Sequence, residues 1–208
     1  MRENLIGADR VAFFERVLTL AGDYGARGQV TISDTTKGLA SKNSVKHETD
    51  VLLMALERFN YSIRGDLGIV IVARPSGGRT DEDKFLAECA ELVTNGSDYA
   101  KFTNLATNVL TMPFQNSRLL QVADLVVSIT TAMVAGHTEY AAPIFGPVRS
   151  TLRSDLGRIG GVGLKIHPDY SYVNLYHWLL GDEYFKRGSA GITLPMSGRP
   201  FSKDPSRY

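Results

Sequence analysis

The sequence predicts an α/β fold, a three-layer sandwich built on a mostly parallel sheet. Segments with the 3.6-residue periodicity of amphipathic helices alternate with short β-branched runs along the first two thirds of the chain. The run "LGIVIVA", residues 67–73, is continuously apolar, as a strand buried on both faces requires. Beyond residue 136 the pattern becomes richer in helices than in strands. Together these observations indicate parallel strands connected by helices, with a helix-rich C-terminal part.

Length and composition are those of an ordinary globular protein. With 208 residues, 43% of them hydrophobic and 22% charged, we expect a single folded domain over residues 1–208. We expect its core over 9–136, a helical extension over 137–190 and a tail over 191–208. The single cysteine, Cys89, suits a reducing cytoplasm and excludes a multi-cysteine zinc site. Since no segment has the roughly 18 charge-free apolar residues of a membrane span, we expect a cytoplasmic protein without one.

In the first half of the chain the predicted elements follow one another closely. An amphipathic helix begins at Asp9, and a strand in "GQVTISD" ends at Asp34. A polar loop leads to a second helix over 47–63, and the buried strand 67–73 follows. Thr80 is then expected as the N-cap of a third helix that ends near Gly96.

In the second half a strand in "ATNVLTMPF" precedes a strongly apolar helix, whose expected N-cap is Asn116 or Ser117. A short helix is predicted near 146–155 and an aromatic-rich helix over 171–185. The segment between them, "GRIGGVGLKIHP", resembles a phosphate-binding loop in its glycines but lacks the lysine and hydroxyl that end that motif. We interpret it as a flexible connection.

The apolar helix carries one narrow polar stripe. Ser117, Gln121, Asp124 and Ser128 lie at spacings of four, three and four, which places them along one helix face. Their neighbours are apolar, so we expect this helix to be packed on most of its sides. Because an uncompensated buried carboxylate costs several kcal/mol, Asp124 then needs a partner. It belongs either to a structural hydrogen-bond network or to a site for a divalent metal.

The stretch "MPFQNSRLLQVADLVVSITTAMVAG" resembles the C-terminal hallmark of a mostly bacterial and phage family, domain of unknown function 3800. The matching positions are Ser117, Leu120, Gln121, Ala123 and Asp124. The resemblance implies a ribonuclease-H-like fold and metal-dependent cleavage of nucleic acid, with Mg²⁺ or Mn²⁺ as the cofactor. In such a nuclease Asp124 would bind the metal, while Gln121 and Ser117 would orient water or the scissile phosphate.

The sequence departs from this family in its acidic residues. No Asp-Glu-Ser-Gly stretch precedes the helix, and Ala73 and Arg74 follow the central strand where the family tends to have an aspartate. The chain is therefore a truncated product, a relative that kept the fold and nucleic-acid binding, or an enzyme that uses other carboxylates. Asp34 is the best replacement ligand, since carboxyl ends of parallel strands meet at the active edge of α/β sheets, although a simple Asx cap in a turn is the more common role of such an aspartate.

Several cations are candidates for contacts with nucleic acid. The overall charge of +1 supplies no attraction to a polyanion, but residues 149–208 hold 9 basic and 5 acidic side chains. The candidate phosphate contacts are Arg74, Arg79, Arg149, Arg153 and Lys165. A different class of function is therefore open: a non-catalytic nucleic-acid-binding or oligomeric assembly protein of a mobile-element or defence system.

Aromatic residues near the C-terminus allow two interpretations. The aromatic side chains of "YSYVNLYHWLL" either stack on bases or close the core or a dimer face. A homodimer is plausible because an unpaired sheet edge invites another strand. The four histidines do not pair at ligand spacing, and Cys89 lies among apolar helix positions, which predicts a buried structural thiol.

Overall fold

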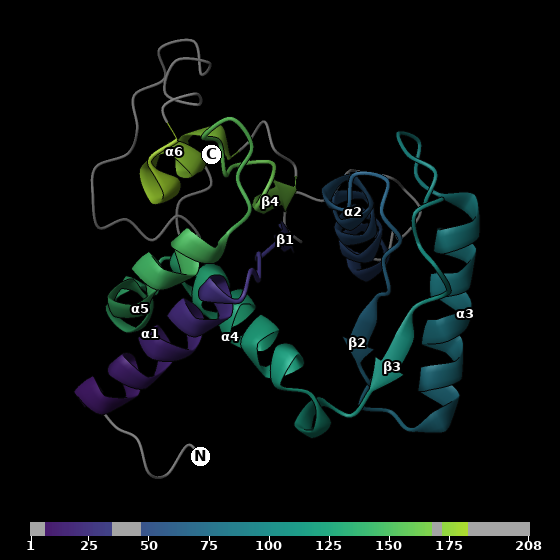
Figure 1. Cartoon of the computed structure of the whole chain (residues 1–208), viewed down its shortest axis with the longest axis horizontal. Helices are drawn as coiled ribbons and strands as arrows, with labels where there is room; N and C mark the ends of the chain where they lie inside the picture. The colour runs from purple at the N-terminus through teal and green to yellow at the C-terminus, as the bar shows by residue number, and fades with distance from the viewer. Residues whose placement is uncertain (1–6, 35–46, 168–171, 183–208) are drawn as a thin grey trace. The chain divides into compact units, whose positions relative to one another are not determined.

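The computed structural model describes residues 7–34, 47–167 and 172–182 (Figure 1). The chain forms two compact units. We call residues 1–38 with 122–208 the terminal unit and residues 39–121 the central unit. The division falls within one helix, after Gln121.

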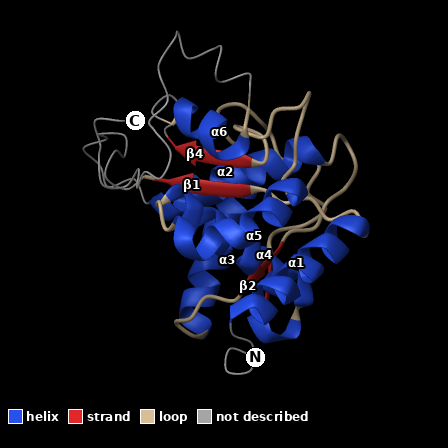
Figure 2. Cartoon of the chain, turned by 90° about the vertical axis from the view of Figure 1, so that its left-hand side faces the viewer, coloured by secondary structure: helices blue, strands red, loops and turns tan. Residues whose placement is uncertain are grey.

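The terminal unit is built around two parallel strands. Val30 lies opposite Leu164 and Ser33 opposite His167, and Figure 2 shows the two strands side by side. Its elements are α1 (Gly7–Asp23), β1 (Val30–Ser33), most of α4 (Arg118–Val134), α5 (Thr138–Thr151), β4 (Leu164–His167) and α6 (Val173–Leu180). Parallel pairing and the mixed α/β class are confirmed.

Apolar side chains of all these elements form the core of the terminal unit. Leu18 of α1, Val148 of α5 and Leu164 of β4 are completely buried, and Tyr176 of α6 joins them. Burying each aliphatic side chain of this size contributes about 1.5–3 kcal/mol. The amphipathic stripes predicted for the first and last helices therefore meet in one cluster.

The glycine-rich segment 157–168, predicted to be a flexible connection, contains β4. Leu164 and Ile166 alternate with Lys165 and His167, the period of a strand with one buried face. Upstream, the Gly28 amide donates to Thr151 O (2.8 Å), and the Val30 amide donates to Gly163 O (2.8 Å). Amides two residues apart in a strand point to the same edge of the strand. Residues 151–153 therefore pair with the chain just before β1, and β4 pairs with β1 itself along the same edge.

The helix predicted near 146–155 is longer and begins earlier, because α5 extends over Thr138–Thr151 and contains Pro143 and Pro147. Proline removes a helix hydrogen bond and normally ends a helix. Here Ala141, Ile144 and Val148 form a buried stripe. The burial of this stripe outweighs the cost of the prolines.

The central unit has a second parallel pair of strands. Ile71 lies opposite Leu110, and Ala73 lies opposite Met112. Its elements are α2 (His47–Ser62), β2 (Ile71–Ala73), α3 (Arg79–Asn95), β3 (Leu110–Met112) and the 3₁₀ turn η1 (Phe114–Asn116). Within the described residues the strands thus form two sheets of two strands each, rather than the one sheet that we predicted. The N-cap of α3 is Gly78, not Thr80.

Among the described residues of the central unit, the helices cover one face of the β2–β3 sheet. Val72 and Val109 pack with Leu56 of α2 and Cys89 of α3, whereas Ile71 on the other face is 44% exposed. The prediction that residues 67–73 are buried on both faces is wrong for the described structure. The reason is that both helices of the central unit pack against the same side of its sheet.

The Cys89 thiol is completely buried, as predicted, and its burial raises its pKa to about 11. Because the thiolate is the nucleophile, we expect the native protein not to react with a disulfide reagent such as dithionitrobenzoate at pH 8. The same protein unfolded in guanidinium should release one equivalent of the coloured product. Fast reaction without denaturant would contradict the buried position.

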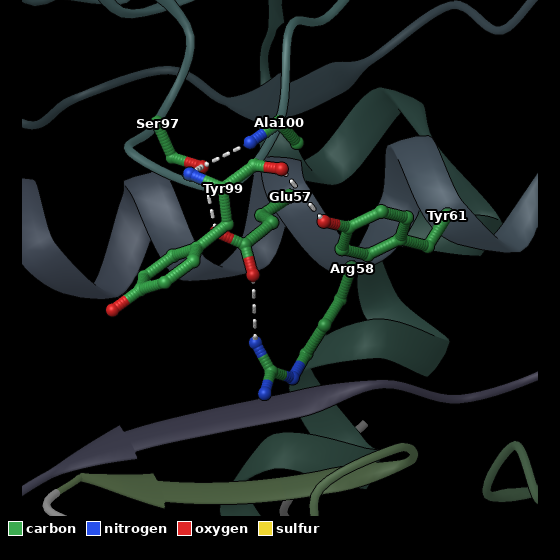
Figure 3. A network of polar contacts seen from close by, with 6 residues as sticks. All are labelled: Glu57, Arg58, Tyr61, Ser97, Tyr99 and Ala100. Atoms are coloured by element: carbon green, nitrogen blue, oxygen red, sulfur yellow. Dashed lines mark hydrogen bonds and ion pairs between the residues drawn. The ribbon is translucent and has the colours of Figure 1, made fainter.

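The loop after α3 is fixed by hydrogen bonds (Figure 3). The Ser97 hydroxyl donates to Glu57 Oε2 (2.8 Å) and accepts from the Ala100 amide (3.0 Å), while the Tyr61 hydroxyl donates to Tyr99 O (3.2 Å). Gly96 begins this loop at φ 72°, a backbone angle that favours glycine. The contacts join the ends of α2 and α3 in the central unit.

None of the helices in the described part of the chain is long and apolar enough to cross a membrane.

Candidate functional site

The polar stripe of α4 faces solvent instead of a packed interior. Asp124 and Ser128 are exposed, and so are Leu119 (74%) and Val127 (44%). Only the stripe of Val126, Thr130 and Met133 is fully buried. The prediction that this helix is packed on most of its sides is therefore wrong. A solvated carboxylate needs no partner to offset burial, so the energetic reason for a ligand at Asp124 disappears.

Ser117 and Gln121 stabilise the start of α4. Ser117 is the N-cap, since its Oγ accepts from the Leu120 amide (3.3 Å). Gln121 Oε1 accepts from Arg118 Nη1 (3.1 Å), and its Nε2 donates to Gln115 O (3.3 Å). These contacts correspond to the structural interpretation of the stripe, in which the two side chains complete local hydrogen bonds.

We expect removal of the Asp124 carboxylate to leave stability nearly unchanged. An Asp124→Ala variant should differ from wild type by less than about 0.5 kcal/mol in the free energy of unfolding, as for most exposed substitutions. Urea unfolding followed by circular dichroism measures this difference. A loss of several kcal/mol would instead show that Asp124 belongs to a buried network.

Asp34 directly follows β1, at the carboxyl end of the strand, as predicted. Its amide donates to His167 O (3.0 Å), and its half-buried carboxylate accepts a hydrogen bond from the Tyr172 hydroxyl. Side chains alternate along an extended strand, so Asp34 lies on the same face as the buried Val30. The carboxylate is thus held at the core side of the sheet edge.

Asp34 and Asp124 lie in different parts of the terminal unit. Val126 of α4 lies against Gly28, which precedes β1. Asp34 follows Gly28 by six residues, and an extended chain rises about 3.3 Å per residue, so Asp34 lies roughly 20 Å from Gly28. Asp124 projects from the opposite side of α4 to Val126. The described residues include no group of three His, Cys, Asp or Glu side chains that could hold a metal ion. They do not supply the ligand set that a two-metal nuclease needs.

The other face of the β1–β4 sheet carries polar side chains. Thr31 lies opposite Lys165, and Ser33 lies opposite His167. Each of these four residues alternates with an inward-facing apolar residue, and all four are half-buried. We call Thr31, Ser33, Lys165 and His167 the polar face. It brings hydroxyl, ammonium and imidazole groups together on two hydrogen-bonded strands.

This arrangement suits an anionic ligand. Ammonium and hydroxyl groups are common donors to phosphate oxygens, and none of the four side chains is acidic. Strands hold side chains more rigidly than loops do, which lowers the entropy lost on binding. The polar face is the candidate functional site of the terminal unit.

Of the five predicted phosphate contacts, the structure places only Lys165 on the polar face. Arg153 lies at the other end of the sheet, where its amide donates to Gly28 O (2.9 Å). The Arg149 guanidinium lies beside Gly181, after the end of α6, where a cation favours the helix dipole. Neither residue lies at the carboxyl end of β1.

Arg74 and Arg79 lie in the central unit, around Glu82. Arg74 Nε forms an ion pair with Glu82 Oε1 (3.1 Å), and the Thr111 hydroxyl donates to the same oxygen. The Thr111 hydrogen bond, followed by the charges of Arg74 and Arg79, holds the pKa of Glu82 below its ordinary value. Glu82 therefore stays ionised at neutral pH. It is a partner of these arginines in the first turn of α3, where an acidic side chain favours the helix dipole.

The aromatic residues of α6 and its flank serve the core. Tyr172 is 4% exposed, and Tyr176 is completely buried, so the core interpretation holds for both; Tyr170 lies outside the described residues. The Tyr176 hydroxyl accepts a hydrogen bond from the Ile166 amide (2.8 Å), so this backbone donor of β4 has a partner. The homodimer stays a prediction, but a second chain could not pair with this amide without displacing Tyr176.

Sequence reasoning did not select Thr31, Ser33 or His167 for the site. The signal was present, because "VTIS" and "LKIH" have the same apolar-polar alternation. What was missing was the pairing of two segments that lie more than 130 residues apart.

Comparisons with protein-family models, with curated proteins and with solved structures give no match.

Proposed function

We propose that the terminal unit binds the phosphodiester backbone of a nucleic acid on its polar face. The observation that carries this proposal is the cross-strand pairing of Thr31 with Lys165 and of Ser33 with His167 on a sheet whose opposite face is buried in the core. A lysine ammonium binds phosphate as a point charge, while hydroxyl groups fix its orientation.

The charge distribution of the sequence supports a polyanionic ligand. The excess of basic residues over 149–208 includes Lys165 and begins in the last turn of α5. Contacts of this kind carry no sequence information, because phosphate groups are the same at every step. We therefore propose binding without strong sequence preference.

The proposal includes the family resemblance in a restricted form. The protein is a relative of the ribonuclease-H-like family that has kept nucleic-acid binding while its α4 residues serve helix capping and solvation. Two features support this: the parallel strands connected through helices, and the use of Ser117 and Gln121 in capping contacts.

Replacement of Lys165 tests the site. We expect Lys165→Ala to weaken binding of fluorescent single-stranded and duplex oligonucleotides about tenfold, since a hydrogen bond to a charged group contributes about 1.5 kcal/mol. The slope of log affinity against log salt should fall by about 1, the value for one phosphate contact. Fluorescence anisotropy at several salt concentrations measures both quantities.

The matched control removes a cation elsewhere in the same unit. Arg16 is exposed on α1, so Arg16→Ala changes the net charge equally without touching the sheet. It should bind oligonucleotides as wild type does. Equal losses in both variants would show only a general charge effect, and no binding by the wild-type protein would refute the proposed function.

Metal-dependent cleavage is the second candidate, favoured by the position of Asp34 at the carboxyl end of a parallel strand. Calorimetric titration of Mg²⁺ and Mn²⁺ into the wild-type chain, Asp34→Asn and Asp124→Ala separates the two candidates. Because the Asp34 carboxylate already accepts a hydrogen bond from Tyr172 and Asp124 is exposed, we expect no saturable binding of either metal ion that depends on one of these aspartates. Binding that disappears in one of the variants would favour the nuclease.

A further inference from the structure

Three side chains of α6 and its two flanks contact the β1–β4 sheet and the loop before β4. They reach the carboxyl end of β1, the middle of β4 and the loop that precedes β4. The contacts are the Tyr172 hydroxyl with the Asp34 carboxylate, the Tyr176 hydroxyl with the Ile166 amide, and the Asp182 carboxylate with the Ile159 and Gly160 amides.

Asp182 is a buried carboxylate bound by consecutive backbone amides. Its side chain accepts from the Gly160 amide (2.6 Å) and from the Ile159 amide (3.1 and 3.2 Å to its two oxygens), and the residue is only 4% exposed. Successive amides that converge on one point form an anion-binding concavity. The glycine-rich segment thus does bind an anion, but this anion is a carboxylate of the same chain.

The anion site is linked directly to β4. The Leu164 amide donates to Ile159 O (3.2 Å), and the Gly161 amide donates to Leu164 O (2.7 Å). Ile159 therefore contacts Asp182 through its amide and the first residue of β4 through its carbonyl. Lys165 of the polar face follows one residue later.

We infer that Asp182 is a positioning residue for the polar face, acting by filling the anion site formed by the Ile159 and Gly160 amides. The effect on oligonucleotide binding, through the placement of Lys165 and His167, rests on the proposed function. The anion site itself rests only on the hydrogen bonds of Asp182. Without the carboxylate, two amides in a buried loop lose their acceptor, and the loop that sets the start of β4 loses its anchor to α6.

The experiment replaces the internal anion by an external one. In Asp182→Ala we expect the NMR amide signals of Ile159, Gly160 and Lys165 to shift, and oligonucleotide affinity to fall about tenfold, as for loss of one charge-assisted contact. Sodium formate, a carboxylate small enough for the vacated space, should return both the signals and the affinity toward wild type. Sodium chloride at equal concentration is the control for ionic strength.

Asp182→Asn is the conservative variant. Its amide oxygen keeps one acceptor, so it should retain more affinity than Asp182→Ala. If the alanine form does not fold, Asp182→Asn still tests the inference, because its Lys165 amide signal should shift and its affinity should fall, with no response to formate since its side chain fills the site. Wild-type signals at Lys165 together with wild-type affinity in Asp182→Ala would overturn the inference, as would equal effects of formate and chloride. If the wild-type protein binds no oligonucleotide, the proposed function fails, whereas the NMR response to formate still decides whether the anion site exists.

Discussion

A Gly163→Ala variant is expected to lose about 3 kcal/mol or more of unfolding free energy, at or above the upper end of overpacking effects. A Cβ at this position would lie 2.3 Å from Arg153 O and 2.8 Å from Arg153 N. Both are backbone atoms of a segment that is itself hydrogen-bonded to Gly28. A flexible side chain can move away from an added methyl group, but this segment can do so only by breaking its pairing with the chain before β1.

Chemical denaturation followed by circular dichroism measures this loss. Gly146→Ala is the matched control, because Gly146 lies in α5 and a Cβ there meets no atom within 4 Å. In a helix interior this exchange should stabilise by about 0.5–1 kcal/mol. If both variants unfold at the wild-type midpoint, Gly163 is not packed against Arg153 as described.

The Tyr176→Phe variant should lose about 2 kcal/mol of unfolding free energy, the cost of leaving a buried amide without an acceptor. The ring keeps its shape and its packing, so the loss reports on the hydroxyl alone. That hydroxyl accepts from the Ile166 amide (2.8 Å) in a completely buried position. Amide hydrogen exchange at Ile166 should accelerate in the variant by an amount that matches the loss in global stability or exceeds it.

Tyr61→Phe provides the control for this experiment. The Tyr61 hydroxyl also takes part in a hydrogen bond, which it donates to Tyr99 O (3.2 Å), but the residue is 49% exposed (Figure 3). Water replaces the lost partner there, so we expect a change within about 0.5 kcal/mol. Similar losses in both variants would show that burial does not distinguish the two hydroxyls.

The two stability predictions and the proposed function concern the same part of the molecule. Gly163 directly precedes β4, Tyr176 binds the Ile166 amide of β4, and β4 carries half of the polar face. A variant that loosens β4 should therefore also weaken oligonucleotide binding under conditions in which it is still folded. Lys165→Ala, in contrast, should weaken binding while the backbone pairing of β4 with β1 is kept.

Part of the candidate site follows from the sequence. The alternation in "GQVTISD" predicts a strand that ends at Asp34, and the structure places Asp34 directly after β1. Ser117 as an N-cap also follows, because its role depends only on residues within the next turn. Lys165 was a candidate from charge alone. Its neighbours Thr31 and His167 were not, since nothing local connects them.

Local periodicity determined which segments of this protein are helices, because hydrogen bonds within a helix join residues only four apart. It did not determine β4, whose partner β1 lies more than 130 residues away, or the extent of α5, where a buried stripe outweighs two prolines. Nor did it determine that Asp124 faces solvent while Asp182 is buried on backbone amides. Whether a carboxylate is solvated or enclosed depends on what packs around it, and only the tertiary structure decides that.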